Sequence, residues 1–144
     1  MEHKALPAVG DEIPAVRVDD VSADKIKIMA LIFRDPNPIH FDTDAVRAAG
    51  LGDRYVNQGG VTMAYAINML IAWAGSRSAI RSVTCRFQAN VFEGDSIEVG
   101  GTVTDVQTIA DDTTVTCDIW ARLADQPEAT TVIGGTATVA WGTK

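Results

Sequence analysis

A carboxylate and an imidazole, Asp35 and His40, lie five positions apart in a stiff stretch of this chain. Between them stand Pro36, Asn37 and Pro38. Each proline fixes its own φ and biases the preceding residue towards extended backbone, so a helix cannot continue through the segment. A carboxylate held beside a histidine suits general acid–base catalysis, because histidine titrates near neutral pH and the carboxylate orients or shares its proton.

The same segment also has a purely structural interpretation. Asp-Pro and Asn-Pro are ordinary turn signals, and a histidine that follows a turn at the surface needs no function. Features elsewhere in the chain are therefore needed to distinguish a simple turn from a catalytic site.

Predicted elements place this segment in a loop. Residues 13–18 favour a short strand, and Ser22 is a good N-cap for a helix that runs to Phe33 and is ended by Pro36. Residues 42–49 favour a second, short helix closed by a glycine. The acid–imidazole segment then connects the two helices.

The run over residues 61–75 is apolar on nearly every side, with Thr62, Tyr65 and Asn68 as its polar interruptions. A helix that is apolar all round is buried in a protein core or in a membrane. A membrane span needs about 20 residues. The run is shorter, so it predicts a central helix surrounded by protein.

After this helix the hydrophobic period changes to two. The alternation is strong over residues 82–91 and 114–123 and weaker over 97–106 and 133–141. These segments predict four half-buried strands in a meander, each with one apolar face that needs a covering layer. The apolar helix supplies that layer, which gives an α+β fold with an antiparallel sheet curled round one buried helix.

Composition limits the functions to be considered. The 144 residues favour a single domain, and the formal charge of −7 argues against non-specific binding to nucleic acid or to an anionic membrane. The N-terminus lacks the apolar stretch of a secretory signal, so we expect a cytoplasmic protein.

Cysteine and histidine usage favours a reducing compartment and argues against a metal site. Cys85 and Cys117 fall inside strand patterns, which favours buried free thiols in a reducing compartment. With two histidines and no cysteine cluster, we expect no metal site.

The segment from Arg34 to Asp42 resembles the hydratase signature of the MaoC-like family of (R)-specific enoyl-thioester hydratases and dehydratases, usually Gly-Asp-x-Asn-Pro-hydrophobic-His. Residues 58–63 resemble the family's His-Gly-Met segment, and residues 86–95 resemble its Arg-Phe…Pro-Gly-Asp strand and turn. The three matches occur in the family's order and spacing. Arg34 and Gln58 depart from the pattern, because the family usually has glycine and histidine there.

The resemblance implies a fold, an activity and partners for residues 1–144 as one domain. The fold is the hotdog fold, and the activity is addition of water to a trans-2-enoyl thioester to give an (R)-3-hydroxyacyl thioester, or the reverse dehydration. No cofactor is implied beyond the coenzyme A or acyl carrier protein that carries the substrate. Repulsion between two acidic proteins favours acyl-CoA. We expect a homodimer or a heteromer with another hotdog chain.

The resemblance also implies catalytic roles. Asp35 acts as the main base on a water that it holds together with His40, and Asn37 braces the loop. Backbone N–H groups of Gly59 or Gly60, at the start of the apolar helix, stabilise the thioester oxygen, where the helix dipole favours negative charge. A simple turn explains the two glycines equally well.

Further residues are weaker candidates. Gln58 and Asn68 are expected to shape the site, and Arg34 and Arg86 to contact substrate, although a solvated strand face explains Arg86 as well. Arg47 and Arg54 are candidates for the pantetheine phosphates by their charge alone.

Two alternative functions remain. A hotdog thioesterase usually carries a carboxylate on its central helix, and residues 61–75 contain no Asp or Glu. A non-catalytic hotdog subunit that completes a partner's site would not need the intact pair of Asp35 and His40.

Overall fold

The protein is described by a computed structural model that covers residues 5–126 and 128–142. Strand β1 (Glu12–Val18) leads into helix α1 (Ala23–Phe33), a 3₁₀ turn η1 (Pro38–His40), helix α2 (Thr43–Ala48) and the long helix α3 (Gly59–Ala74). The second half is built from strands. It begins with the 3₁₀ turn η2 (Arg77–Ala79). The strands that follow are β2 (Ile80–Phe87), β3 (Ile97–Ile109), β4 (Asp112–Leu123) and β5 (Thr131–Trp141).

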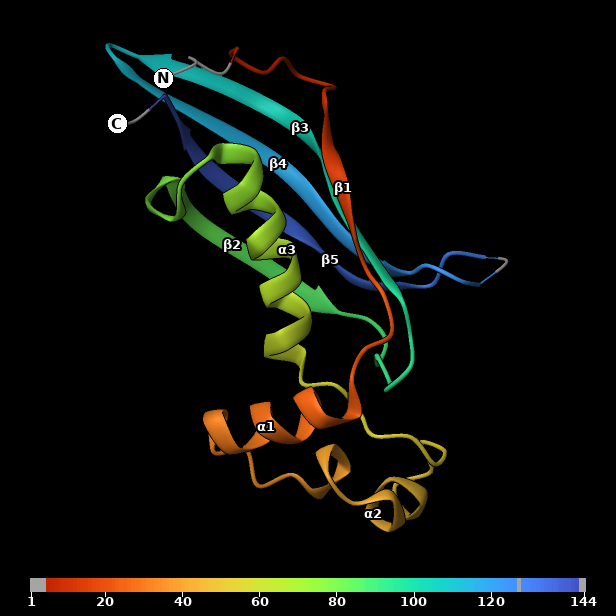
Figure 1. The fold of residues 1–144 in the computed structure, drawn as a ribbon. Helices are drawn as coiled ribbons and strands as arrows, with labels where there is room; N and C mark the ends of the chain where they lie inside the picture. The colour runs from red at the N-terminus through yellow and green to blue at the C-terminus, as the bar shows by residue number, and fades with distance from the viewer. Residues whose placement is uncertain (1–4, 127, 143–144) are drawn as a thin grey trace.

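The five strands form one antiparallel sheet in the order β1-β3-β4-β5-β2 (Figure 1). The predicted α+β class is confirmed, but the predicted four-strand meander is wrong in one respect. Strand β2 pairs with β5 at the sheet edge rather than with β3, and residues 88–96 carry the chain across to β3. Hydrophobic alternation shows which face of a strand is buried, and it does not show which strand is the neighbour.

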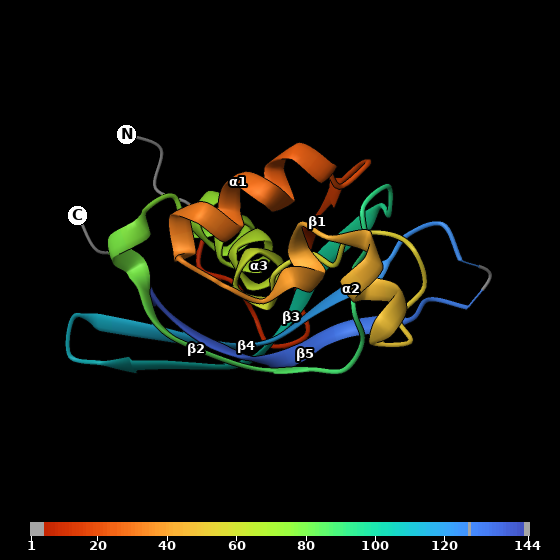
Figure 2. The same cartoon turned by 90° about the horizontal axis from the view of Figure 1, so that it is seen from below.

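Helix α3 lies in the concavity of the curled sheet, and Figure 2 shows it nearly end-on in front of the sheet. One stripe of α3 is fully buried against the sheet, formed by Thr62, Ala66, Met69 and Leu70. The prediction that protein surrounds this helix is only partly met, because Ile67 and Ile71 are half-buried and Asn68 is exposed. One side of an apolar helix therefore remains uncovered in the monomer.

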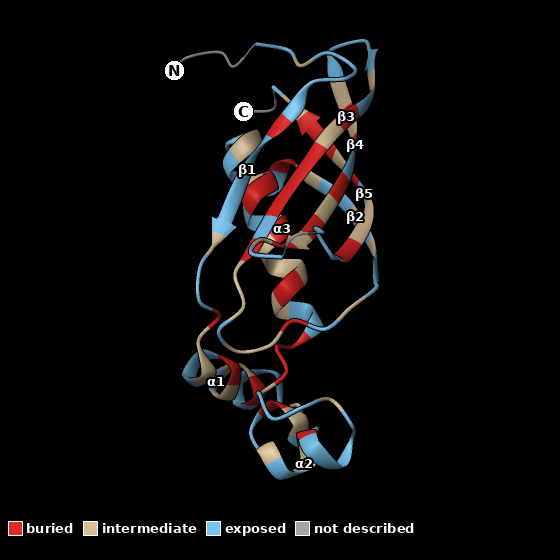
Figure 3. Ribbon diagram, turned by 90° about the vertical axis from the view of Figure 1, so that its right-hand side faces the viewer, coloured by how far each residue is buried: buried red, intermediate tan, exposed pale blue. Residues whose placement is uncertain are grey.

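Helices α1 and α2 lie beyond the N-terminal end of α3, where Figure 3 shows mostly exposed residues. The Ser22 side chain accepts a hydrogen bond from the Lys25 N–H and caps α1, as predicted. The helix ends at Phe33, before Pro36, because Arg34 adopts a left-handed cap conformation. The Asp42 side chain caps α2 in the same way. These caps fix both ends of the segment that contains Asp35 and His40.

Both cysteines are free thiols, as predicted. Cys117 is buried, as predicted, whereas Cys85 is only half-buried. In the part of the chain that the structure describes, no helix is long and apolar enough to cross a membrane.

Candidate active site

The structure brings Asp35 and His40 together at the end of α1. His40 Nε2 lies 3.2 Å from Asp35 Oδ2. The histidine side chain is only 7% exposed and the aspartate side chain 33% exposed, so solvent reaches the pair from the carboxylate side. A buried imidazole beside a partly exposed carboxylate is suited to exchanging protons with a small molecule held next to the carboxylate.

The other ring nitrogen fixes the protonation pattern of His40. Nδ1 lies 2.6 Å from the backbone oxygen of Val56. A carbonyl oxygen only accepts hydrogen bonds, so Nδ1 carries a proton and donates it to Val56. Nε2 and the carboxylate then face each other across 3.2 Å, which is within hydrogen-bond range. Such a pair is suited to general acid–base chemistry.

A short hydrogen-bonded turn holds Asp35 in place. Its backbone N–H donates to the Ala30 oxygen, and its Oδ1 accepts the Asn37 N–H at 3.0 Å. The Asn37 Oδ1 accepts the N–H of Ile39 at 3.3 Å. With Asp35 Oδ1 engaged by the backbone, Oδ2 is the oxygen left for His40 and substrate. Asn37 braces this turn, and its side chain takes no part in the proton-transfer pair.

The unusual Arg34 has a local structural consequence. Its φ of 52° and ψ of 40° place it in the left-handed region that glycine occupies without steric cost. The backbone ahead of Asp35 is therefore the one that glycine favours, although the residue is arginine. Arginine therefore places a long cationic side chain here while the backbone keeps the conformation that glycine would adopt.

The start of α3 is the second predicted part of the site, although neither Gly59 nor Gly60 lines the cavity beside Asp35. Gly59 and Gly60 are the first residues of the helix, and Gln58 makes no side-chain cap there. N–H groups in a first helical turn have no partner within the helix, so they are available to an anion. A Cβ atom on Gly59 would lie 3.1 Å from the Phe87 ring, and one on Gly60 would lie 3.5 Å from the Phe33 ring. Two phenylalanines therefore flank these donors, and glycine leaves space beside them.

Gln58 is buried at this helix start, with 3% exposure. Its Nε2 donates to the Ile26 oxygen of α1 at 3.0 Å, so the side chain links the helix that precedes Asp35 to the helix that begins with the glycines. Its Oε1 is buried without a hydrogen-bond partner. Such an acceptor costs free energy unless a water or ligand donor reaches it.

A cavity of about 510 Å³ lies against the carboxylate, between α1 and the segment after it. Asp35 shares its walls with apolar side chains and two cations; the full lining is Lys27, Ala30, Leu31, Arg34, Asp35, Pro36 and Phe41. Its size is in the range of ligand-binding cavities. The cavity therefore offers an apolar surface next to the proton-transfer pair.

Two other cavities lack this pair. One, of about 240 Å³, lies between the end of β1 and α3, and its lining includes Asn57, Val61 and Tyr65. Burial raises the pKa of the Tyr65 phenol, which keeps it protonated at neutral pH.

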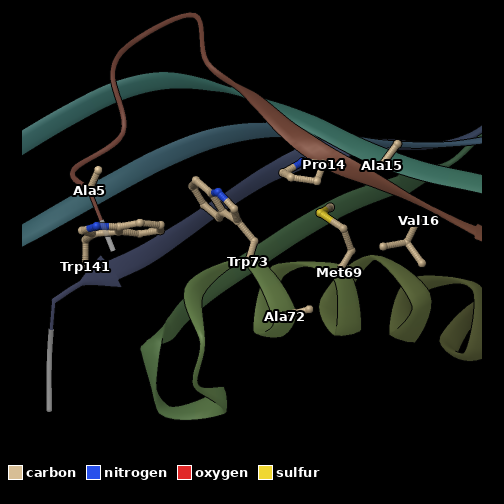
Figure 4. A pocket seen from close by; sticks show the side chains of 8 residues that line it. All are labelled: Ala5, Pro14, Ala15, Val16, Met69, Ala72, Trp73 and Trp141. Carbon is tan, nitrogen blue, oxygen red and sulfur yellow. The ribbon is translucent and has the colours of Figure 1, made fainter. Parts of the chain in front are cut away.

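The third cavity, of about 460 Å³, lies under β1 near the C-terminal half of α3 (Figure 4). Figure 4 shows Met69 and Trp73 projecting from α3 towards Pro14, with Trp141 beside Trp73. The two indole rings pack at a centroid distance of 4.7 Å. None of the residues that line this cavity is titratable, so its lining cannot transfer protons.

Several weaker candidates lie away from the pair. Asn68 is exposed on α3, about 13 Å along the helix axis from Gly59. Arg86 is exposed on β2, on the strand face opposite the half-buried Val83 and Cys85. Neither residue lines the cavity beside Asp35 in the monomer.

The two arginines that were candidates by charge alone are both paired with carboxylates. Arg47 pairs with Asp44 at 2.6 Å, and Arg54 pairs with Asp95 at 2.7 Å. These ion pairs make both side chains poorer phosphate ligands than sequence alone indicates.

Three features of the site were not predicted. The Val56 carbonyl that orients His40 belongs to the backbone, and no side-chain pattern marks it. Phe33 and Phe87 read as ordinary apolar residues of a helix and a strand, yet both are about half exposed at the start of α3. The only sequence feature that could have indicated a role for Phe87 is that it is apolar and stands at the last position of an exposed edge strand.

Comparison with known proteins supports the family resemblance that the sequence motifs indicate. Residues 4–121 match the family of MaoC-like domains. The mitochondrial 3-hydroxyacyl-[acyl-carrier-protein] dehydratase of Arabidopsis thaliana is 32% identical over 94 residues, which are 65% of this chain and 54% of that protein. The chain thus spans about half the length of this curated relative.

Solved structures share the fold. A MaoC-like dehydratase from Rhodospirillum rubrum is 27% identical with a TM-score of 0.78, over 96% of this chain and 94% of that one. An (R)-hydratase from A. caviae involved in PHA biosynthesis is 19% identical with a TM-score of 0.75, over 94% and 97% of the two chains. The fold is therefore the hotdog fold predicted from the sequence.

Proposed function

Because this chain belongs to the MaoC-like domain family, we propose that it is a hydro-lyase that hydrates trans-2-enoyl thioesters to (R)-3-hydroxyacyl thioesters, or catalyses the reverse dehydration. The observation that carries the proposal is the pair of Asp35 and His40, 3.2 Å apart, beside a largely apolar cavity. An acid–base pair next to an apolar surface suits a reaction in which water adds to an acyl chain.

The pair handles the protons of this reaction. A water held against Asp35 Oδ2 loses a proton to the pair as its oxygen bonds to C3. The electrons of the C2=C3 double bond move towards the thioester oxygen, and the pair returns one proton to C2. One O–H bond and the C=C π bond break, one C–O bond and one C–H bond form, and the pair ends in its starting protonation state.

Charge on the thioester oxygen needs a separate group. In the proposal, the N–H groups of Gly59 or Gly60 hold this oxygen at the positive end of α3. Gly59 and Gly60 are exposed beside the rings of Phe33 and Phe87, so a thioester oxygen can reach the donors from solvent. Loss of such a donor typically costs about 3 kcal/mol of transition-state stabilisation.

The carrier is proposed to be coenzyme A rather than acyl carrier protein, because the chain carries a formal charge of −7 and carrier proteins are acidic. The assembly is proposed to be a homodimer, or a heteromer with a second hotdog chain, that covers the open side of α3 and the β2 edge.

Single-residue variants test the assignment. Asp35→Asn and His40→Ala should each lower the rate of crotonyl-CoA hydration at least about a hundredfold, the usual contribution of an acid–base group. The rate is followed as loss of the enoyl-thioester absorbance, and circular dichroism checks that the fold is retained. Asp44→Asn, which removes an exposed carboxylate from α2, is the matched control and should leave the rate unchanged.

The same assay separates the alternatives. Release of free thiol in place of hydroxyacyl product would identify a thioesterase. Turnover near the wild-type level in either site variant would remove Asp35 and His40 from the mechanism.

A further inference from the structure

Two cations line the same cavity as Asp35: Lys27, whose ammonium lies 4.7 Å from the centroid of the Tyr55 ring, and Arg34. Within the described part of the chain, no carboxylate pairs with its guanidinium, whereas Arg17, Arg47 and Arg54 all pair with aspartates. An uncompensated guanidinium on the wall of an otherwise largely apolar cavity is a ready site for a carboxylate or phosphate.

The backbone at this position argues that the side chain has a function. Arg34 occupies a left-handed conformation that glycine adopts without cost and that other residues adopt at a loss of free energy. Strained backbone clusters at active sites and ligand clamps, where the surrounding structure holds it in place. At this turn, glycine would satisfy the backbone and arginine adds only its long cationic side chain.

Distance decides which anion fits. Arg34 directly precedes Asp35 in the chain and lines the same cavity, so an anion bound to Arg34 lies within about 10 Å of the carbons on which Asp35 acts. In a pantetheine thioester, about thirteen bonds separate the sulfur from the first phosphorus. At the reach of extended backbone, these bonds span about 15 Å. An anion at Arg34 is therefore too close to the reacting carbons to be a carrier phosphate.

We propose that Arg34 binds a carboxylate on the acyl group, so that the preferred substrate is a carboxyl-terminated trans-2-enoyl thioester. This inference rests on the proposed hydratase function. Arg34 forms a bidentate ion pair with the carboxylate, and Ala30, Leu31 and Phe41 contact the carbon chain between that carboxylate and the double bond. The chain as a whole is acidic, with a charge of −7, so a local cation favours entry of an acyl group that carries one negative charge.

Matched substrates test this proposal. Two enoyl thioesters of equal chain length are compared, one with a terminal methyl group and one with a terminal carboxylate, each on coenzyme A and on pantetheine without phosphates. We expect the wild-type protein to favour the carboxyl-ended substrate at least about tenfold in kcat/KM, on both carriers, as one charge-assisted pair provides. Arg34→Gln should abolish this preference, while Arg34→Lys should keep part of it.

Two controls separate specificity from structure. Arg34→Gly should not lower the melting temperature, because glycine suits the left-handed conformation, yet it should lose the preference as Arg34→Gln does. Arg77→Gln removes one exposed cation from η2 beyond the C-terminal end of α3, and it should leave the preference unchanged.

Several results would overturn the proposal. It fails if the wild-type protein shows no preference between the ends, or if Arg34→Gln keeps the preference. It also fails if Arg34→Gln instead reduces turnover on coenzyme A relative to pantetheine, which would assign Arg34 to the carrier phosphates.

Calorimetric binding of the saturated methyl- and carboxyl-ended thioesters keeps this inference separate from the proposed function. If the wild-type protein hydrates no enoyl thioester, the proposed function fails. Arg34-dependent preference for the carboxyl-ended saturated thioester would still support the binding site, and its absence would overturn it.

Discussion

His40 shows how much the orientation of a candidate catalytic residue is set by its backbone neighbours. The imidazole is buried and donates from Nδ1 to the Val56 oxygen, which leaves only Nε2 to face Asp35. The proline-rich spacing predicts a rigid connection between the acid and the base, and the structure confirms that they meet. The spacing does not predict which nitrogen is free, because that depends on a carbonyl 16 residues further along the chain.

Cys117 provides a test of burial at a single residue. Burial, with a smaller contribution from the charge of Asp118, raises the pKa of its thiol from 9.0 to about 11. A raised pKa means that the folded state keeps a proton that the unfolded state loses between these values. Its contribution to stability is therefore complete below about pH 9 and is lost as the pH rises towards 11.

Urea unfolding across this pH range measures the effect. The midpoint for the wild-type protein should fall more steeply between pH 9 and pH 11 than the midpoint for Cys117→Ala, which retains Cys85 and all other titratable groups. Equal slopes for the two proteins would mean that the thiol is not buried as described.

The order of the strands decides which elements meet at the site. Because β2 pairs with β5, its last residue, Phe87, ends beside the first turn of α3. Gln58 supplies a second link by donating to Ile26 of α1. Asp35 follows α1 and Gly59 begins α3, so these contacts set the position of the proposed base relative to the proposed N–H donors.

The β2–β5 pairing can be tested with two glycines of β5. A Cβ atom on Gly135 would lie 2.1 Å from the backbone oxygen of Thr84 and 2.7 Å from the Cα of Cys85, so Gly135→Ala must push β2 away. A Cβ atom on Gly134 would meet only the end of the Gln88 side chain, which can move. We expect a loss of at least about 2 kcal/mol in the free energy of unfolding for Gly135→Ala, and less than about 0.5 kcal/mol for Gly134→Ala.

Urea unfolding of the two variants decides the question. Equal losses of stability would contradict the close approach of the two strands at Gly135. If Gly135→Ala keeps its stability but hydrates enoyl thioesters more slowly, the contact positions Phe87 and does not stabilise the sheet.

Element types were more predictable than element contacts. The apolar run of α3, the Ser22 cap of α1 and the strand alternation were read correctly, because each is a local pattern. The position of β2 at the edge and the exposure of Phe87 were not, because both depend on pairing between segments that are far apart in sequence. The Asp35–His40 contact was predictable because its geometry is also local.

The monomer leaves an apolar surface and a strand edge open on one side. Ile67 and Ile71 are half-buried on α3, on the side away from the β1 cavity. Edge strand β1 carries Pro14 and a register shift, whereas β2 pairs in regular register from Ser82 to Phe87. A regular exposed edge beside an uncovered helix face is suited to a second hotdog chain.

We therefore expect a dimer in solution, with a mass of two 15.3 kDa chains by light scattering. The double variant Ile67→Glu/Ile71→Glu should shift the protein to monomer, because charge at an apolar interface is unfavourable. Ile109→Glu, at a position that is 75% exposed at the end of β3, should leave the mass unchanged. A monomeric wild-type protein, or a dimer that persists in the double variant, would contradict this interface.

Isotope labelling tests most directly the proposal that Asp35 and His40 add water to an enoyl thioester. The protein is incubated with trans-2-enoyl-CoA in ¹⁸O-labelled water, and the product is examined by mass spectrometry and chiral chromatography. We expect ¹⁸O on C3 of an (R)-3-hydroxyacyl-CoA with the thioester intact, and no label incorporation by Asp35→Asn. Label in a free carboxylic acid, an (S) product, or full incorporation by Asp35→Asn would contradict it.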